Sequence, residues 1–172
     1  MSYFAAAAVR DPQGWTAAQL DLSGAADVED VAERLRDVGG DAAVSLLFVE
    51  ADDSYLVIMR LDDGEDLRIF GSDATFTAES RLGALLLGEV EEPALDLDDE
   101  LVEEVETGVA EPSPPAPEVE PVGDPDLLSD LGVTPHRLLE LCGHAGMLPS
   151  DITAEVCQVL GCGDEVEELR EA

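Results

Sequence analysis

Three short apolar runs separated by acidic turns dominate the pattern between residues 44 and 70. The runs are VSLLFVE, YLVIMRL and LRIF, and they are rich in Val, Ile, Leu, Tyr and Phe, which fit a half-buried pleated surface. Asp, Ser and Gly, the residue types that favour turns, fill the gaps at 52–54 and 62–66. The pattern therefore predicts a three-stranded antiparallel meander.

The segment before the meander predicts an opening hairpin. Residues 3–9 are apolar and Ala-rich, a turn cluster follows at 10–14, and apolar and polar residues alternate over 15–22. The Ala run also fits a helix, but it is short and Pro12 and Gly14 follow it closely, so we favour a strand. Trp15 is expected to pack on the sheet or its edge.

Two helices are predicted around the meander. From Ser23 or Asp27 the pattern changes: apolar residues recur at three- and four-residue spacing from Val28 to Val38. The pattern stops at Gly39-Gly40, which predicts an amphipathic helix. After the third strand, residues 71–73 break the pattern and offer an N-cap for a second helix over roughly 74–87.

The predicted order for residues 1–87 is therefore β-β-α-β-β-β-α. The economical fold for it is α+β, with a five-stranded antiparallel sheet flanked by two helices. This order is similar to that of longin and roadblock-type, profilin-like domains, which mostly serve as docking modules. A shared fold does not by itself define a function.

The rest of the chain divides into two segments. Residues 88–126 are acidic and Pro-rich, and we expect an extended, largely disordered linker. Residues 127–172 have helical patterns, with Thr134 placed to cap a helix that begins at Pro135 and another start at Pro149. So small a helical mini-domain is expected to need docking on the first domain or on a partner.

Charge is concentrated in the middle segment. The chain has 41 acidic and 8 basic residues, a net charge of −33, and no lysine. Residues 88–126 alone hold 15 acidic and no basic residues. Phosphate backbones and anionic lipid repel such a chain, so we expect no direct binding to nucleic acid or membrane, and a basic protein as partner. The alternative is that the acidity only maintains solubility, or reflects a high-salt habitat or biased codon usage.

Within this segment, ten carboxylates are the candidates for contact with a basic partner. They are Glu89, Glu91, Glu92, Asp96, Asp98, Asp99, Glu100, Glu103, Glu104 and Glu106. Apolar residues between 95 and 105 would let this stretch form a short helix, or leave it open until the partner arrives.

Potential metal ligands gather in the C-terminal segment: His136, Cys142, His144, Cys157 and Cys162. Zinc fingers pair ligands two to four residues apart in two clips, whereas here one residue separates Cys142 from His144 and four separate Cys157 from Cys162. We therefore expect buried, reduced cysteines and no metal site.

Catalytic and cofactor motifs are also missing from the sequence. No third group that would orient a Cys/His pair can be identified, and without lysine there is no P-loop cation. Paired carboxylates occur throughout and therefore discriminate nothing. We expect no catalytic residue and no cofactor.

The start MSYFAAAAVRD lacks a positively charged region before its apolar run, and no run of about 18 apolar residues occurs. With three cysteines, an odd number, the chain is expected to be cytoplasmic with reduced thiols.

Three stretches carry a resemblance to a known family. They are SYFAAAAVR with Gly14-Trp15, VEADDSYLVIMRLDDGEDLRIFGSDATFTAESRLGALLL, and DPDLLSDLGVTPHRLLELC with LPSDITAEVCQVLGC. Together they resemble the bacterial tRNA adenosine deaminase-associated proteins. The chain lacks the zinc deaminase signature His-x-Glu followed by Pro-Cys-x-x-Cys, so it is not the deaminase itself. The resemblance implies an accessory or regulatory partner.

Two hypotheses follow. In the first, the protein is a non-catalytic accessory or regulatory interaction protein whose acidic segment and helical C-terminal segment engage a basic surface, that of the tRNA adenosine deaminase. In the second, the N-terminal sheet domain binds a small molecule or carries an enzymatic site, for which the turn at 72–74 before a helix offers an anion-binding position. A plain N-cap also explains that turn.

Overall fold

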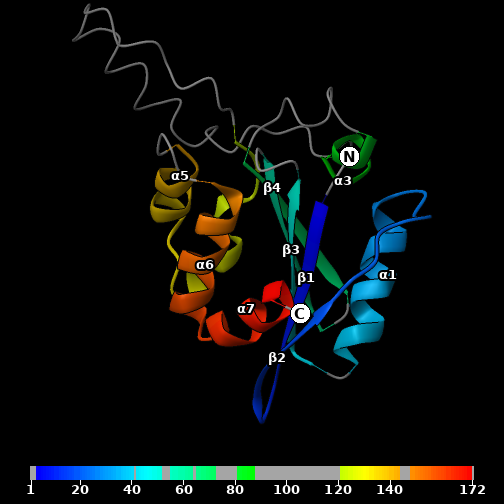
Figure 1. Cartoon of the computed structure of the whole chain (residues 1–172), viewed down its shortest axis with the longest axis horizontal. Coiled ribbons are helices and arrows are strands. Elements are labelled where there is room, and N and C mark those ends of the chain that lie inside the picture. The colour runs from blue at the N-terminus through cyan, green and yellow to red at the C-terminus, as the bar shows by residue number, and fades with distance from the viewer. Residues whose placement is uncertain are drawn as a thin grey trace, which may run out of the picture.

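A six-stranded antiparallel sheet runs through the centre of the computed structural model, with helices on both faces (Figure 1). The structure describes residues 3–40, 42–51, 55–63, 65–72, 81–87, 121–143 and 148–171. The strands are β1 (Tyr3–Asp11), β2 (Gly14–Gln19), β3 (Val44–Ala51), β4 (Tyr55–Asp62), β5 (Asp66–Gly71) and β6 (Val122–Gly123), in the order β2-β1-β3-β4-β5-β6. The α+β class and the antiparallel sheet are confirmed.

The helices fall into two groups along the chain. The first group comprises α1 (Val28–Gly39) and α3 (Arg81–Leu87). The second follows β6 and comprises the 3-10 helix η2 (Pro125–Leu131), α5 (Pro135–Gly143), α6 (Pro149–Leu160) and α7 (Gly163–Glu171). Among the described residues up to Leu87 the elements follow the predicted order β-β-α-β-β-β-α, and residues 74–80 of the predicted second helix lie outside them. The likeness to longin and roadblock-type domains stays a prediction.

The prediction of five strands is wrong, because β6 adds a sixth. Val122 pairs with Gly71 and Gly123 with Phe70 at the edge of β5, and the Asp124 N–H donates to the Ile69 carbonyl at 2.9 Å. These residues stand at the end of the segment expected to be a linker. A two-residue strand among prolines and carboxylates has no periodicity of its own, so only the exposed edge of β5 defines it.

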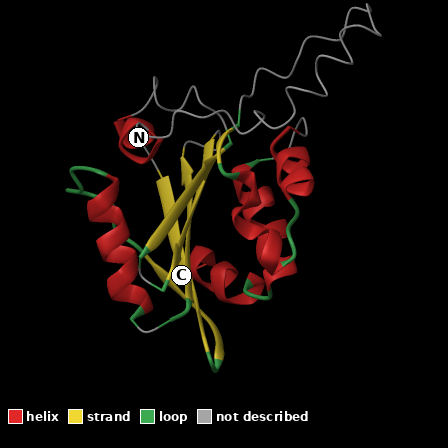
Figure 2. Cartoon of the chain, turned by 180° about the vertical axis from the view of Figure 1, so that it is seen from behind, coloured by secondary structure: helices red, strands yellow, loops and turns green. Residues whose placement is uncertain are grey.

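Both faces of the sheet are covered (Figure 2). Side chains of alternate residues point to opposite faces, so Leu46, Phe48 and Ile58 pack against the helices of the second group. Leu47 and Met59 pack on the other face, against α1 and α3. The C-terminal helices are thus part of one hydrophobic core with the sheet.

The local signals at α1 are those expected. The Asp27 side chain accepts a hydrogen bond from the Asp30 N–H at 3.1 Å, and Gly40 (φ 56°) donates its N–H to the Arg36 carbonyl. An anionic N-cap and a glycine at the C-terminal end fix both ends of the helix.

Trp15 joins the outermost strand to the C-terminal helices. Its Nε1–H donates to the Leu160 carbonyl at the end of α6, at 3.0 Å, and its ring packs against the core on that face. Since β2 is the edge of the sheet, the expected place of Trp15 is confirmed.

Candidate functional site

Arg60 is a charged residue within the apolar strand β4, and only 4% of its surface is exposed. By strand alternation it lies on the same face as Leu56 and Ile58, the face covered by the C-terminal helices. A guanidinium in such a place is costly unless it is paired and hydrogen-bonded.

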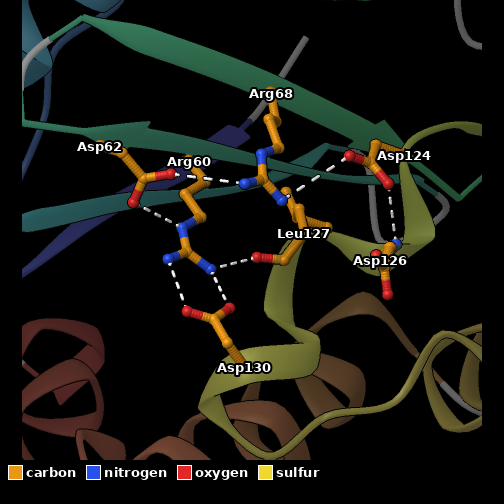
Figure 3. A network of polar contacts seen from close by, with 7 residues as sticks. All are labelled: Arg60, Asp62, Arg68, Asp124, Asp126, Leu127 and Asp130. Atoms are coloured by element: carbon orange, nitrogen blue, oxygen red, sulfur yellow. Dashed lines mark hydrogen bonds and ion pairs between the residues drawn. The ribbon is translucent and has the colours of Figure 1, made fainter.

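The cluster around Arg60 supplies those partners (Figure 3). Its Nε–H donates to Asp62 Oδ1 at 2.9 Å, and its two terminal nitrogens donate to the two carboxylate oxygens of Asp130, the Nη2 bond being 2.9 Å long. Nη1 also donates to the Leu127 carbonyl. We call Arg60, Asp62, Asp130 and the Leu127 carbonyl the Arg60 clasp.

A second arginine extends the cluster toward solvent. Arg68 stands opposite Arg60 in the β4–β5 register, and its guanidinium lies 3.8 Å from Asp62 and 3.9 Å from Asp124. Two like charges directly opposite would repel, and Asp62 between them offsets that repulsion. Because Arg68 and Asp124 are each 41% exposed, their pair contributes little to stability.

The clasp shifts the pKa values of both members of its ion pair. The hydrogen bond from Arg60, opposed by partial burial, lowers the pKa of Asp130 below its ordinary 3.8. The Asp130 hydrogen bond likewise raises the pKa of Arg60, so both groups are charged throughout the physiological range.

The geometry suits anchoring better than catalysis. The Arg60 donors point at Asp62, Leu127 and Asp130, all within the protein, and the result is that η2 is held on the sheet. Sequence reasoning missed the clasp. The signal was Arg60 itself, a charged residue inside the apolar run of β4, but nothing in the sequence points to a partner in η2.

The helices that the clasp anchors have an acidic surface. Residues 121–171 contain eleven acidic residues and two arginines. Seven of these carboxylates are exposed: Asp126, Asp130, Glu140, Asp151, Asp164, Glu167 and Glu168. We call these seven the acidic helical layer.

The ten predicted contact residues, from Glu89 to Glu106, lie outside the described residues. The structure does show where the segment that contains them begins and ends. Leu87, the last residue of α3, packs so closely on Gly71 that a Cβ there would come within 2.6 Å of a Leu87 methyl, and Val122 pairs with the same Gly71. The acidic segment therefore leaves and rejoins the fold at one point on β5.

The predicted anion-binding turn is partly described. Ser72 is buried, its N–H donates to the Leu56 carbonyl at 2.8 Å, and its Oγ accepts from the Leu56 N–H at 3.0 Å. Ser72 thus extends the pairing of β4, while residues 73 and 74 lie outside the described residues.

The structure describes four of the five predicted metal ligands. Cys142, Cys157 and Cys162 are buried, His136 is exposed, and His144 lies outside the described residues. Burial raises the pKa of Cys142 to about 12. In the described part of the chain, no three His, Cys, Asp or Glu side chains form a group that could hold a metal ion.

The fold and the Arg60 clasp define an α+β protein whose C-terminal helices are docked on one face of its sheet. These helices carry the seven carboxylates of the acidic helical layer. A family model, the Rv3753c-like tRNA adenosine deaminase-associated protein, matches residues 3–163, and the chain belongs to this family. The predicted resemblance is confirmed. The family's description names an association with the tRNA adenosine deaminase. No curated protein and no solved structure matches the chain. No helix in the described ranges has the length and apolar character needed to cross a membrane.

Proposed function

We propose that the protein is a non-catalytic accessory protein that binds the tRNA adenosine deaminase through its carboxylates. Two features support the proposal: the family's described association with that enzyme, and a net charge of −33 that favours a basic partner. An enzyme that acts on tRNA needs Lys and Arg side chains for the phosphate backbone. Those side chains form the surface that this protein would bind.

The attachment of the acidic segment at Gly71 is the observation that carries the proposal furthest. Residues 88–121 hold 13 acidic and no basic residues, and both ends of this stretch meet at the same point of the sheet. The two residues that flank this stretch, Leu87 and Val122, both contact Gly71, and Asp124 and Asp126 follow shortly after β6. A basic surface would meet one concentrated region of negative charge.

Carboxylates in that region would occupy the arginines and lysines that otherwise bind tRNA phosphates. The deaminase would then bind either this protein or tRNA on that surface. Contacts of this kind speed association and set specificity, and salt weakens them. The carboxylates that we assign to the contact are the ten between Glu89 and Glu106, assisted by the acidic helical layer.

Equilibrium binding of the full chain to the purified deaminase at low salt tests the proposal. In one variant the ten carboxylates between Glu89 and Glu106 are replaced by their amides, and we expect its affinity to fall at least about tenfold, because each lost charge pair is worth a few tenths of a kcal/mol. A second variant neutralises α7 with Asp164→Asn, Glu167→Gln and Glu168→Gln, and should lose less.

The matched control neutralises three exposed carboxylates of α1, on the other side of the sheet, with Glu29→Gln, Glu33→Gln and Asp37→Asn. It should bind like the natural protein. Failure to form a complex, or equal losses in the control and in the ten-residue variant, would refute the proposal.

A further inference from the structure

Cys157 and Cys162 are brought together by the way α6 ends. Gly161 has φ 103°, a left-handed conformation, and donates its N–H to the Cys157 carbonyl at 2.8 Å. The Cys162 N–H reaches the same carbonyl at 2.9 Å. This is a Schellman-type cap, in which the residue after the glycine contacts the side chain five positions earlier. In most proteins that contact is between two apolar side chains, and here it is between two thiols.

The two thiols form a pair distinct from the third cysteine. Both residues are fully buried in the same core cluster. A hydrogen bond from the Cys157 thiol lowers the pKa of Cys162, although burial and the nearby Glu165 oppose the shift. Burial alone acts on Cys142, and raises its pKa to about 12. The hydrogen bond from Cys157 therefore favours the thiolate of Cys162, the reactive form, whereas burial disfavours the thiolate of Cys142.

A cleft between α6 and α7 reaches Cys157. It is lined by Cys157, Gly163 and Val166 together with Ala154, Gln158 and Glu167. Gly163 directly follows Cys162 and contributes no side chain. The cleft therefore reaches the pair at Cys157 and at the residue after Cys162, and peroxide reaches the buried Cys162 sulfur when the chain opens locally there.

We propose that Cys157 and Cys162 are a site of reversible oxidation by hydrogen peroxide, closing to a disulfide across the end of α6. The Cys162 thiolate attacks one peroxide oxygen and the O–O bond breaks, which gives a sulfenic acid on Cys162 and, with a proton, one water. The Cys157 sulfur then attacks the Cys162 sulfur, so that the S–S bond forms and the S–O bond breaks. The departing hydroxide takes the Cys157 proton and leaves as a second water. Two electrons pass from the sulfurs to peroxide, and a thiol reductant reverses the change.

Trp15 lies beside this site and reports on it. A Cβ added to Gly161 would come 3.7 Å from the Trp15 ring, and the indole N–H donates to Leu160, two residues before Cys162. It is the single tryptophan of the chain. A disulfide formed at Cys157 and Cys162 would change its emission, which makes the oxidation visible in the folded protein.

The test is peroxide treatment of the folded full chain, followed by intact mass measurement, peptide mapping and thiol titration after unfolding. We expect two of the three thiols to disappear, with a loss of about 2 Da and a mapped link between Cys157 and Cys162. The Trp15 emission should change in step with the thiol loss, and both should return with dithiothreitol. A link involving Cys142, a gain of oxygen without a link, or three unreacted thiols would overturn the proposal.

Two single variants assign the roles. Cys157→Ser keeps a hydrogen-bond donor beside Cys162 and should stop at a sulfenic acid on Cys162, seen as a gain of about 16 Da and trapped by dimedone. Cys162→Ala should react more slowly, since it lacks the favoured thiolate. Cys142→Ala is the matched control and should form the disulfide like the natural protein. Equal reactivity of the first two variants would contradict the assignment of Cys162, and the mapping of the natural chain stands even if a variant does not fold.

Discussion

Arg60 and Asp130 lie 70 residues apart in the chain, and their side chains form a bidentate ion pair that holds η2 on the sheet. The pair is asymmetric, because the Arg60 side chain is 5% exposed and the Asp130 side chain is 60% exposed. Losing the carboxylate would therefore leave a buried cation short of partners, whereas the carboxylate alone could turn to water.

We predict that Asp130→Ala lowers the free energy of unfolding by about 1.5 kcal/mol, the low end of the range for a hydrogen bond to a charged group. The loss stays moderate because Asp62 and the Leu127 carbonyl still accept from Arg60. Urea unfolding measures it. The control is Glu155→Ala, which breaks the exposed pair with Arg137 and should change stability by less than about 0.5 kcal/mol. Equal effects of the two substitutions would contradict the role of the clasp.

The same pair predicts a pH dependence. Arg60 lowers the pKa of Asp130 in the folded state below its ordinary 3.8. Between the two pKa values the unfolded chain binds more protons, so stability rises with pH there. The stability difference between the natural protein and Asp130→Asn should be full above about pH 5 and shrink as pH falls below 3.8. A difference that is constant between pH 6 and pH 3 would exclude a charged pair.

Some of these structural features can be predicted from the sequence, because they depend on residues that are close together in the chain. Short-range signals such as the Asp27 cap, the Gly40 stop and the turns of the meander act within a few residues, so they can be read directly. The strands β3 and β4 are buried along nearly their whole length, and such continuous apolar runs are typical of a sheet covered on both faces. That signal is present in the sequence and points to the docked helices.

The rest depends on contacts between distant parts of the chain. The two residues of β6 pair with β5 across more than 50 positions, and the partner of Arg60 stands in η2. No local periodicity marks either contact. For the candidate site, the charge of the acidic segment is plain in the sequence, whereas the meeting of its two ends at Gly71 appears only in the fold.

The attachment of β6 predicts a sensitive glycine. Gly123 has φ 94°, and a Cβ there would collide with the backbone carbonyl of Ile69, which cannot move without breaking the β5–β6 pairing. We expect Gly123→Ala to destabilise the fold by about 2 to 4 kcal/mol, the strain of positive φ plus the clash. Thermal unfolding measures the loss.

Gly14→Ala is the matched control for that substitution. Gly14 also has positive φ, 131°, but nothing lies within 4 Å of an added Cβ. It should lose only the strain, about 1 to 2 kcal/mol. If the two variants unfold at the same temperature, β6 is not held as the structure describes.

Metal content is a further prediction. The three cysteines are buried and His136 is exposed, so these donors do not converge in the described part of the chain. Elemental analysis of protein purified without a His tag should find well under one zinc per chain, because a structural site needs four converging ligands. Near-stoichiometric zinc that withstands dialysis would show that the donors converge in solution.

The central claim is that carboxylates of this protein bind a basic surface of the tRNA adenosine deaminase. The most direct test is the dissociation constant of the full chain and the purified deaminase, measured from low salt to about 0.5 M salt, where screening acts within about 4 Å. We expect a complex at low salt whose affinity falls steadily as salt rises, and which tRNA displaces. No complex at low salt, or an affinity that salt leaves unchanged, would contradict it.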